Sequence, residues 1–319
     1  MQIRDVRRTA SRTGTALAVA AALAMTTALA GCSVGTSTTG DSGRPRIVVT
    51  TNILGDVVDN VLGDQADVTT LMRPNADPHS FEISAKEAAL LGEADLVVSS
   101  GLGLEEGLQQ HLDRAADAGA PVLVAGDEVT ALPYTSGEAE GAPDPHFWTD
   151  PRTMLDVVDA IEREATSIDD IDAQQLADDA DAYRDELREL DADMAGAFGA
   201  IPKSHRALVT NHHVFGYLAD RFDFRIIGAA VPSGTTLAAP SAADLRELSD
   251  AITEAGVTTI FAESSQPDRL VQVLASEAEI DVRVEELFTE SLSAPGGEAD
   301  TYLALMRANT ERITNGLTQ

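Results

Sequence analysis

Histidine is the residue type through which this chain could bind a metal ion, and six histidines are spread along its 319 residues. Four of them follow a predicted strand or precede a predicted helix: His79, His146, His212 and His213. Because the carboxyl ends of parallel strands meet at one edge of an α/β sheet, we expect these four to lie close together. A single loop histidine is more often a hydrogen-bonded structural residue. Three converging imidazoles, however, favour Zn²⁺, whose protein sites are tetrahedral.

Two of these histidines stand directly behind an Asp-Pro pair, in 77-DPH-79 and 144-DPH-146. Proline fixes its own φ and drives the preceding residue toward extended geometry, so His79 is expected to lie on a stiff connection. A capping box at Ser84 and Glu87 predicts that a helix begins directly after it. The sequence therefore predicts that the His79 imidazole is held in place at the edge of a cleft. The two remaining histidines, His111 and His205, are predicted to lie at the surface.

The elements that would position these residues are short strands that alternate with helices in two halves of the chain. We predict strands at residues 47–50, 66–71, 96–100, 121–126, 207–210, 224–228, 258–263 and 282–287. Such alternation is typical of parallel α/β sheets. Among the intervening segments, residues 105–118 are predicted to be a helix and residues 127–144 a loop, and Asp150 is predicted to be the N-cap of a further helix.

Residues 172–200 carry the longest helical pattern in the chain. Apolar side chains recur along it at three- and four-residue steps: Leu176, Ala180, Tyr183, Leu187, Leu190, Met194 and Ala197. At about 1.5 Å per residue this helix would span roughly 40 Å, enough to run the length of both halves. A coiled-coil partner is the alternative, but the stripe covers too few heptads to favour it.

The charge balance argues against one class of partner. The chain carries 53 acidic and 22 basic residues, a formal net charge of −31. This argues against a nucleic-acid partner, which would require a basic face. Most acidic residues are expected to be solvated at the surface. Only 4% of the residues are aromatic, so we expect cores of mainly Ala, Val, Leu and Ile.

The N-terminus has the pattern of a targeting segment. Four arginines precede an apolar run at about residues 16–30, which is short and alanine-rich for a transmembrane helix. It ends in 29-LAGC-32, which resembles the lipobox of bacterial lipoproteins. The resemblance implies a signal peptide at residues 1–31, an extracytoplasmic protein anchored to the cell membrane by lipid at Cys32, and a flexible tether at residues 32–46. Export by the general secretory or the twin-arginine route stays open. Cys32 is the chain's one cysteine, which excludes an internal disulfide.

Four segments together resemble the metal-binding proteins of bacterial zinc and manganese ABC transporters. They are 72-MRPNADPHSFEISAKEAALLGEADLVVSSGLGLE-105, 146-HFWTDP-151, 209-VTNHHVFGYLADRF-222 and 287-LFTESLSAPGGEADTYLALMRANT-310, in the order found in that family. The resemblance implies two α/β lobes, residues 47–170 and 202–319, joined by one long rigid backbone helix at residues 171–201, with a metal site in the interlobe cleft. It further implies a solute-binding lipoprotein, not an enzyme, that captures Zn²⁺ and delivers it to an ABC transporter permease for import.

The same resemblance implies metal ligands position by position. His79, His146 and His212 match the three histidines of the family, and Glu290 stands where the family often has Asp. His213 is then a neighbour of the site. Glu263 is a competing carboxylate, and water is a third candidate for the fourth ligand. Members tuned to manganese usually have Glu at the third position, so His212 favours Zn²⁺, with Mn²⁺ as the alternative.

Other interpretations stay open at this point. Three histidines with an open fourth position would suit a zinc hydrolase, but the chain has no His-Glu-x-x-His motif. A metal-dependent adhesin is a further alternative. The loop before His146 is acidic and lacks the histidines that many zinc members carry, so a soluble metallochaperone is left open as the source of metal. The protein is expected to be a monomer.

Overall fold

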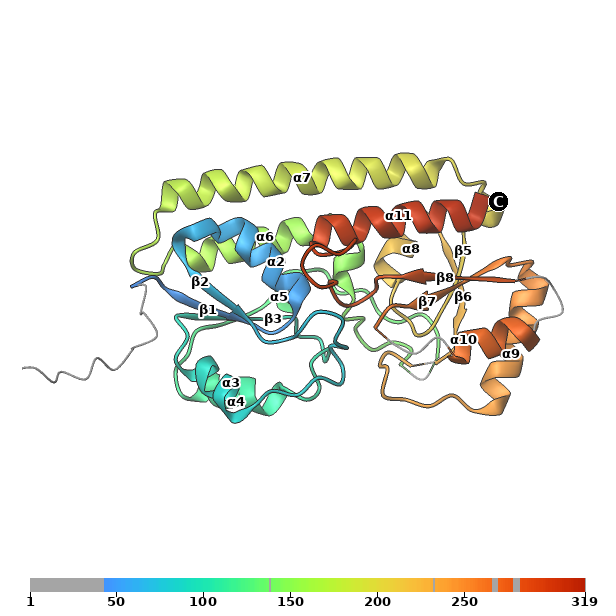
Figure 1. Ribbon diagram of the computed structural model, residues 1–319, viewed down its shortest axis with the longest axis horizontal. Helices are drawn as coiled ribbons and strands as arrows, with labels where there is room; N and C mark the ends of the chain where they lie inside the picture. The colour runs from blue at the N-terminus through green and yellow to red at the C-terminus, as the bar shows by residue number, and fades with distance from the viewer. Residues whose placement is uncertain (1–42, 138, 232, 266–268, 278–281, 319) are drawn as a thin grey trace, which may run out of the picture. The chain divides into compact units, whose positions relative to one another are not determined.

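The computed structural model describes residues 43–137, 139–231, 233–265, 269–277 and 282–318, and the folded unit is Arg44–Gln319 (Figure 1). The predicted signal peptide, Cys32 and most of the predicted tether lie outside the described residues. Within the described part, no helix has the length and apolar character needed to cross a membrane.

The first half of the folded unit contains a four-stranded parallel sheet in the order β2-β1-β3-β4. Its strands are β1 (Arg46–Val49), β2 (Asp67–Thr70), β3 (Leu96–Ser99) and β4 (Val122–Val124). The helices of this half are α2 (Asn52–Leu62), α3 (Ala85–Gly92), α4 (Gln109–Asp117), α5 (Ala125–Glu128) and α6 (Thr153–Ala165). Successive strand residues face opposite sides, so Ile47 and Val49 join a core with α2 and α6, while Val48 and Val97 join one with α3 and α4.

The second half repeats this plan with a parallel sheet in the order β6-β5-β7-β8. Its strands are β5 (Ala207–Thr210), β6 (Arg225–Ala229), β7 (Thr259–Glu263) and β8 (Arg283–Leu287). Its helices are α8 (Gly216–Phe222), α9 (Ala242–Ala255), α10 (Arg269–Glu277) and α11 (Tyr302–Thr318). Val209 and Ile260 pack with α9 and α10, and Leu208 and Phe261 pack on the opposite side. In each sheet the strand order reverses next to the first strand, which creates the switch point where α/β sheets bind ligands.

The long helix α7 (Ala173–Gly199) connects the two halves, which we call the first and second lobes. Asp172 caps it by accepting the backbone N–H groups of Gln174 and Gln175. The predicted apolar stripe is buried from Leu176 to Met194, whereas Ala197 is half-buried. Helix α7 packs against α2 and α6 of the first lobe and against α8 and α11 of the second. Figure 1 shows α11 running beside α7. These observations confirm the predicted fold class.

Three predicted boundaries were wrong. The helix predicted at residues 105–118 begins only at Gln109, because the buried Glu105 carboxylate accepts the N–H groups of Ser100 and Gly101 at 2.7 and 3.0 Å. Residues 125–128, predicted to lie partly in a loop, form the short helix α5. Helix α6 begins at Thr153 rather than directly after Asp150, whose carboxylate accepts the N–H of Arg152.

Candidate metal centre

Four residues predicted as metal ligands lie together at the carboxyl ends of strands. One potential ligand atom from each of His79, His146, His212 and Glu290 lies within 4.8 Å of the others, and none of the four is more than 2% exposed. His79 lies in the connection after β2, His146 precedes the short 3₁₀ helix Phe147–Thr149, His212 follows β5, and Glu290 follows β8. In the part of the chain that the structure describes, this is the one such group.

The Nε2 atoms of the three imidazoles converge on a single carboxylate oxygen. Glu290 Oε1 lies 3.0 Å from His79 Nε2, 3.2 Å from His146 Nε2 and 3.3 Å from His212 Nε2. The Nε2 atoms of His146 and His212 are 3.4 Å apart. Four ligands at about 2.0–2.1 Å from a zinc ion in a tetrahedron are separated by about 3.3–3.4 Å from one another. The distances from Glu290 Oε1 and between His146 and His212 thus approach those of a tetrahedral site, and all four donor atoms lie within 4.8 Å of one another.

Two further carboxylates hold two of the imidazoles from behind. Asp144 Oδ1 accepts the Nδ1–H of His146 at 2.7 Å and its backbone N–H at 2.9 Å. The Nδ1 of His212 is hydrogen-bonded to Glu263 Oε1. Each bond leaves the Nε2 lone pair free to face the centre, which is how carboxylates orient metal-bound histidines in proteins. Glu263, the competing carboxylate of the sequence analysis, thus lies behind His212 and outside the four-residue group.

His79 is held differently from the other two histidines. Its backbone N–H donates to Asp77 Oδ1 at 2.9 Å, but its buried Nδ1 has no hydrogen-bond partner among the described residues. The other carboxylate oxygen of Asp77 accepts Thr236 Oγ1–H from the second lobe at 2.6 Å. The Asp-Pro-His turn therefore fixes the backbone at His79, as predicted, and ties it to the connection between β6 and α9.

The buried charges in the centre shift one another's pKa values. Burial alone would raise the pKa of Glu290, but the adjoining imidazoles, that of His212 above all, hold it well below its usual range. Burial lowers the pKa of His212, but the charges and hydrogen bonds of Glu263 and Glu290 together outweigh this and raise it well above the ordinary value. Asp144 raises the pKa of His146 in the same way. The centre is thus an anionic site with basic imidazoles, which suits a divalent cation.

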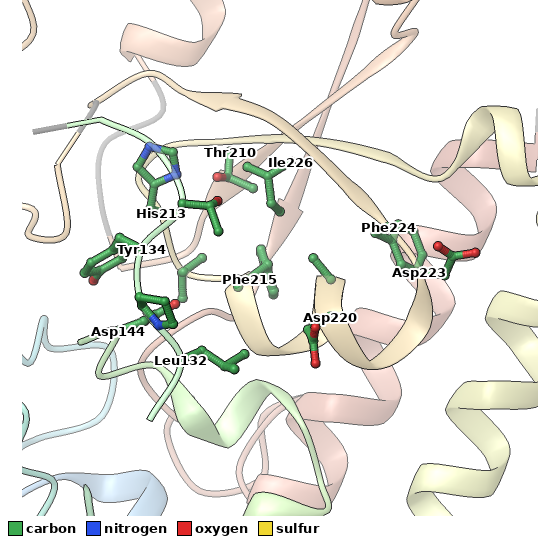
Figure 2. Close-up of a pocket in the computed structure, with 15 residues that line it drawn as sticks. Leu132, Tyr134, Asp144, Thr210, His213, Phe215, Asp220, Asp223, Phe224 and Ile226 are labelled. Atoms are coloured by element: carbon green, nitrogen blue, oxygen red, sulfur yellow. The ribbon is translucent and has the colours of Figure 1, made fainter. Parts of the chain in front are cut away.

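The remaining histidines stay outside the cluster. His213 lines a pocket of about 490 Å³ between the loop at Leu132–Asp144 and α8, together with Tyr134 (Figure 2). Burial and the nearby His212 lower the pKa of His213. His205 is exposed and His111 half-buried. Sequence analysis did not identify Asp144 as the residue that orients the His146 ring. Its position two residues before His146 could have indicated this role.

Comparisons with known proteins show the family to which the chain belongs. Residues 47–316 match the model of a protein family described as "ZnuA: Zinc-uptake complex component A periplasmic". The zinc-binding protein TroA of Treponema pallidum is 28% identical over 279 residues, which cover 86% of this chain and 89% of TroA. The manganese-binding lipoprotein MntA of Halalkalibacterium halodurans is 26% identical over 291 residues, or 91% and 94% of the two chains.

A third relative is the iron-binding protein YfeA of Yersinia pestis, 27% identical over 274 residues that cover 86% of each chain. Among solved structures, the periplasmic zinc-binding protein TroA of Treponema pallidum matches with a TM-score of 0.81 and 27% identity, over 87% of this chain and all of that one. The named relatives thus bind zinc, manganese or iron. The matched span covers both lobes and all four clustered residues, and the chain belongs to the ZnuA family of metal-binding ABC-transporter components, which are solute-binding proteins and not enzymes.

Proposed function

We propose that the protein captures one Zn²⁺ ion with His79, His146, His212 and Glu290 and delivers it to the permease of an ABC transporter for import. The observation that carries this proposal is the convergence of three buried imidazole Nε2 atoms on one buried carboxylate oxygen. A set of three nitrogen donors and one carboxylate is a common zinc environment. The zinc ion is the transported substrate.

The donor set supports zinc over manganese. Mn²⁺ prefers oxygen-rich, higher-coordinate surroundings, whereas three imidazoles and one carboxylate suit a four-coordinate zinc ion. Relatives named for zinc and for manganese both resemble this chain at similar identity, so the argument rests on the donors and not on the names. Glu290 serves as the fourth ligand in this proposal, because Glu263 is already engaged by His212.

The setting of the function follows from the N-terminal pattern. We propose that residues 1–31 are removed, that Cys32 carries the lipid, and that residues 32–46 tether the folded part to the outer face of the cell membrane. In this proposal the folded part consists of two lobes, residues 47–170 and 202–319, joined by residues 171–201. Relatives whose names include lipoprotein support this setting. A monomer is sufficient for the proposed role, because one chain supplies all four donors.

Metal binding by residues 33–319, stripped with a chelator, tests the function. We expect one zinc per chain, held so tightly that a large excess of Mn²⁺ does not displace it. Displacement of zinc by comparable Mn²⁺ would overturn the choice of metal. Absence of any tightly bound divalent ion would overturn the proposed function itself.

A further inference from the structure

The two ends of the loop at Leu132–Asp144, in the first lobe, are tied together directly before the second Asp-Pro-His turn. The carbonyl of Leu132 accepts the N–H of Asp144 at 2.8 Å, and the carbonyl of Ala142 accepts the N–H of Tyr134 at 2.9 Å. Asp144, the residue that holds the His146 ring, therefore lies at a closed neck of this loop. Figure 2 shows Leu132 and Asp144 on the wall of the pocket between the loop and α8.

Helix α8 of the second lobe makes two contacts with this neck. The Tyr217 hydroxyl donates to the carbonyl of Asp144 at 2.9 Å and accepts the N–H of Leu132 at 3.1 Å, so one side chain bridges both ends. Gly216, at the start of the helix, lies against the Asp144 carboxylate so closely that a Cβ at this position would overlap Asp144 Oδ2. A residue with any side chain would displace the carboxylate or the helix.

These contacts form one continuous connection to the metal centre. Tyr217 and Gly216 define the position of Asp144, and Asp144 Oδ1 accepts both the ring Nδ1–H and the backbone N–H of His146. This bond selects the tautomer of His146 whose Nε2 lone pair points to the centre of the site, beside Glu290 Oε1 and His212 Nε2. The connection runs entirely through buried or half-buried groups, where a hydrogen bond is not weakened by competing water.

We propose that Gly216 and Tyr217 are positioning residues of the metal centre: α8 of the second lobe holds Asp144 and, through it, fixes the His146 imidazole supplied by the first lobe. The inference rests on the proposed function, since it assigns these residues a role in metal binding. It also gives a physical reason for the Gly-Tyr pair that begins four residues after His212. His146 is then fixed relative to the lobe that carries His212 and Glu290.

Zinc affinity of the Tyr217→Phe variant tests the proposal most simply. Loss of partners that orient a metal-bound histidine typically lowers metal affinity by about 10- to 100-fold, and we expect a loss of about tenfold here. Tyr183→Phe is a matched control, because Tyr183 is a buried tyrosine of α7 whose hydroxyl has no hydrogen-bond partner among the described residues. We expect its zinc affinity to equal that of the unmodified protein.

Two further measurements separate positioning from a general structural role. In a double-mutant cycle, Tyr217→Phe should weaken zinc binding much less in an Asp144→Asn background, because the two residues act through one connection. The visible absorption of bound Co²⁺ should change in Tyr217→Phe, which reports an altered ligand geometry, and remain unchanged in Tyr183→Phe. Gly216→Ala, which displaces the same carboxylate, should reproduce the loss of affinity and serves if Tyr217→Phe does not fold.

The outcomes distinguish the failure of this inference from failure of the proposed function. Unchanged zinc affinity and Co²⁺ absorption in Tyr217→Phe, with only a lower melting temperature, would overturn the inference while zinc binding by the unmodified protein stands. Fully additive effects of Tyr217→Phe and Asp144→Asn would show that Tyr217 does not act through Asp144, and would overturn it as well. If the unmodified protein binds no zinc, the proposed function fails, and this inference fails with it.

Discussion

Single residues differ in how firmly the fold holds them at the centre. Asp144 and Glu263 orient the rings of His146 and His212, whereas the His79 ring has no such partner among the described residues. The histidine positions pointed to a shared site, and the family resemblance implied His79, His146, His212 and Glu290, with Glu263 and water left open as the fourth ligand; the structure brings these four residues together. The pairing of His212 with Glu263 could not be predicted, since it joins residues 51 positions apart through the neighbouring strands β5 and β7.

Removing a histidine of the centre should abolish tight metal binding. We expect His79→Ala and His212→Ala to weaken zinc binding by orders of magnitude, because each leaves a donor position empty and buried charge uncompensated. His111→Ala, in α4 and outside the cluster, is the control and should bind as the unmodified protein does. Competition with a chelator of known affinity measures the zinc affinity of all three variants. Equal zinc affinities in the three variants would refute the ligand assignment.

Zinc affinity should fall on acidification, and the fall should begin above the ordinary histidine range. Metal binding requires neutral imidazoles, and the carboxylates behind His212 and His146 raise their pKa values above 6.5, so protons compete already at higher pH. Glu290, with its pKa held well below the usual range, stays ionised throughout. Dissociation constants measured from about pH 8 to about pH 5 check this. A constant affinity over that range would contradict a site built of imidazoles.

At the scale of elements, local rules predicted the strands and most helices. The capping box predicted at Ser84 and Glu87 is formed, and α3 begins directly after Ser84. The start of α4 was predicted wrongly because contacts outside the helix determine it. The Glu105 side chain accepts hydrogen bonds from Ser100 and Gly101, which follow β3, and Glu105 is not part of the helix. Sequence periodicity does not reveal such a competition.

The connection between β6 and α9 should slow the loss of zinc. Thr236 in this connection donates to Asp77, whose other oxygen holds the backbone of His79, so the bond links the second lobe to the first beside a ligand. Loss of one such bond costs about 1 kcal/mol, and we expect Thr236→Val to speed zinc release about fivefold. Thr235→Val is the control, because among the described residues its hydroxyl bonds locally, accepting the N–H of Leu237. Stopped-flow transfer to a chelator measures both rates, and equal rates would argue against this role.

In the folded unit as a whole, buried hydrogen bonds join the two lobes through residues that are close in sequence to His146 and Glu290. Trp148 Nε1 donates to the carbonyl of Thr289, and the Tyr302 hydroxyl donates to the carbonyl of Trp148. Asn52 bonds to Ser291 at 2.8 Å. These contacts link residues far apart in the chain, so the sequence alone could not predict them. With α7 and α11 they fix His146 and Glu290 between the lobes.

One interlobe contact should make stability depend on pH. Asp56 of α2 accepts the N–H of Tyr302 in α11, and burial raises the pKa of Asp56 from 3.8 to about 6. A carboxyl group with a raised pKa favours the folded state when protonated. Its contribution is therefore fully present below about pH 3.8 and is lost as the pH rises through about 6.

Asp56→Asn keeps a hydrogen-bond acceptor and removes this charge. It should raise the free energy of unfolding by about 3 kcal/mol at pH 8 and by little at pH 4, as measured with urea on the metal-free protein. Asp193→Asn, at an exposed position of α7, is the matched control and should change little at either pH. A destabilised Asp56→Asn at pH 8 would show that the carboxylate is needed in its charged form.

The central claim is that three imidazoles and one carboxylate hold a single zinc ion between the lobes. X-ray absorption at the zinc edge, on protein loaded with one zinc per chain, tests it most directly. We predict a four-coordinate zinc with nitrogen and oxygen neighbours at about 2.0–2.1 Å and the outer-shell scattering of three imidazoles, reduced to two in His212→Ala. A six-coordinate, oxygen-dominated zinc, or a spectrum that His212→Ala leaves unchanged, would contradict it.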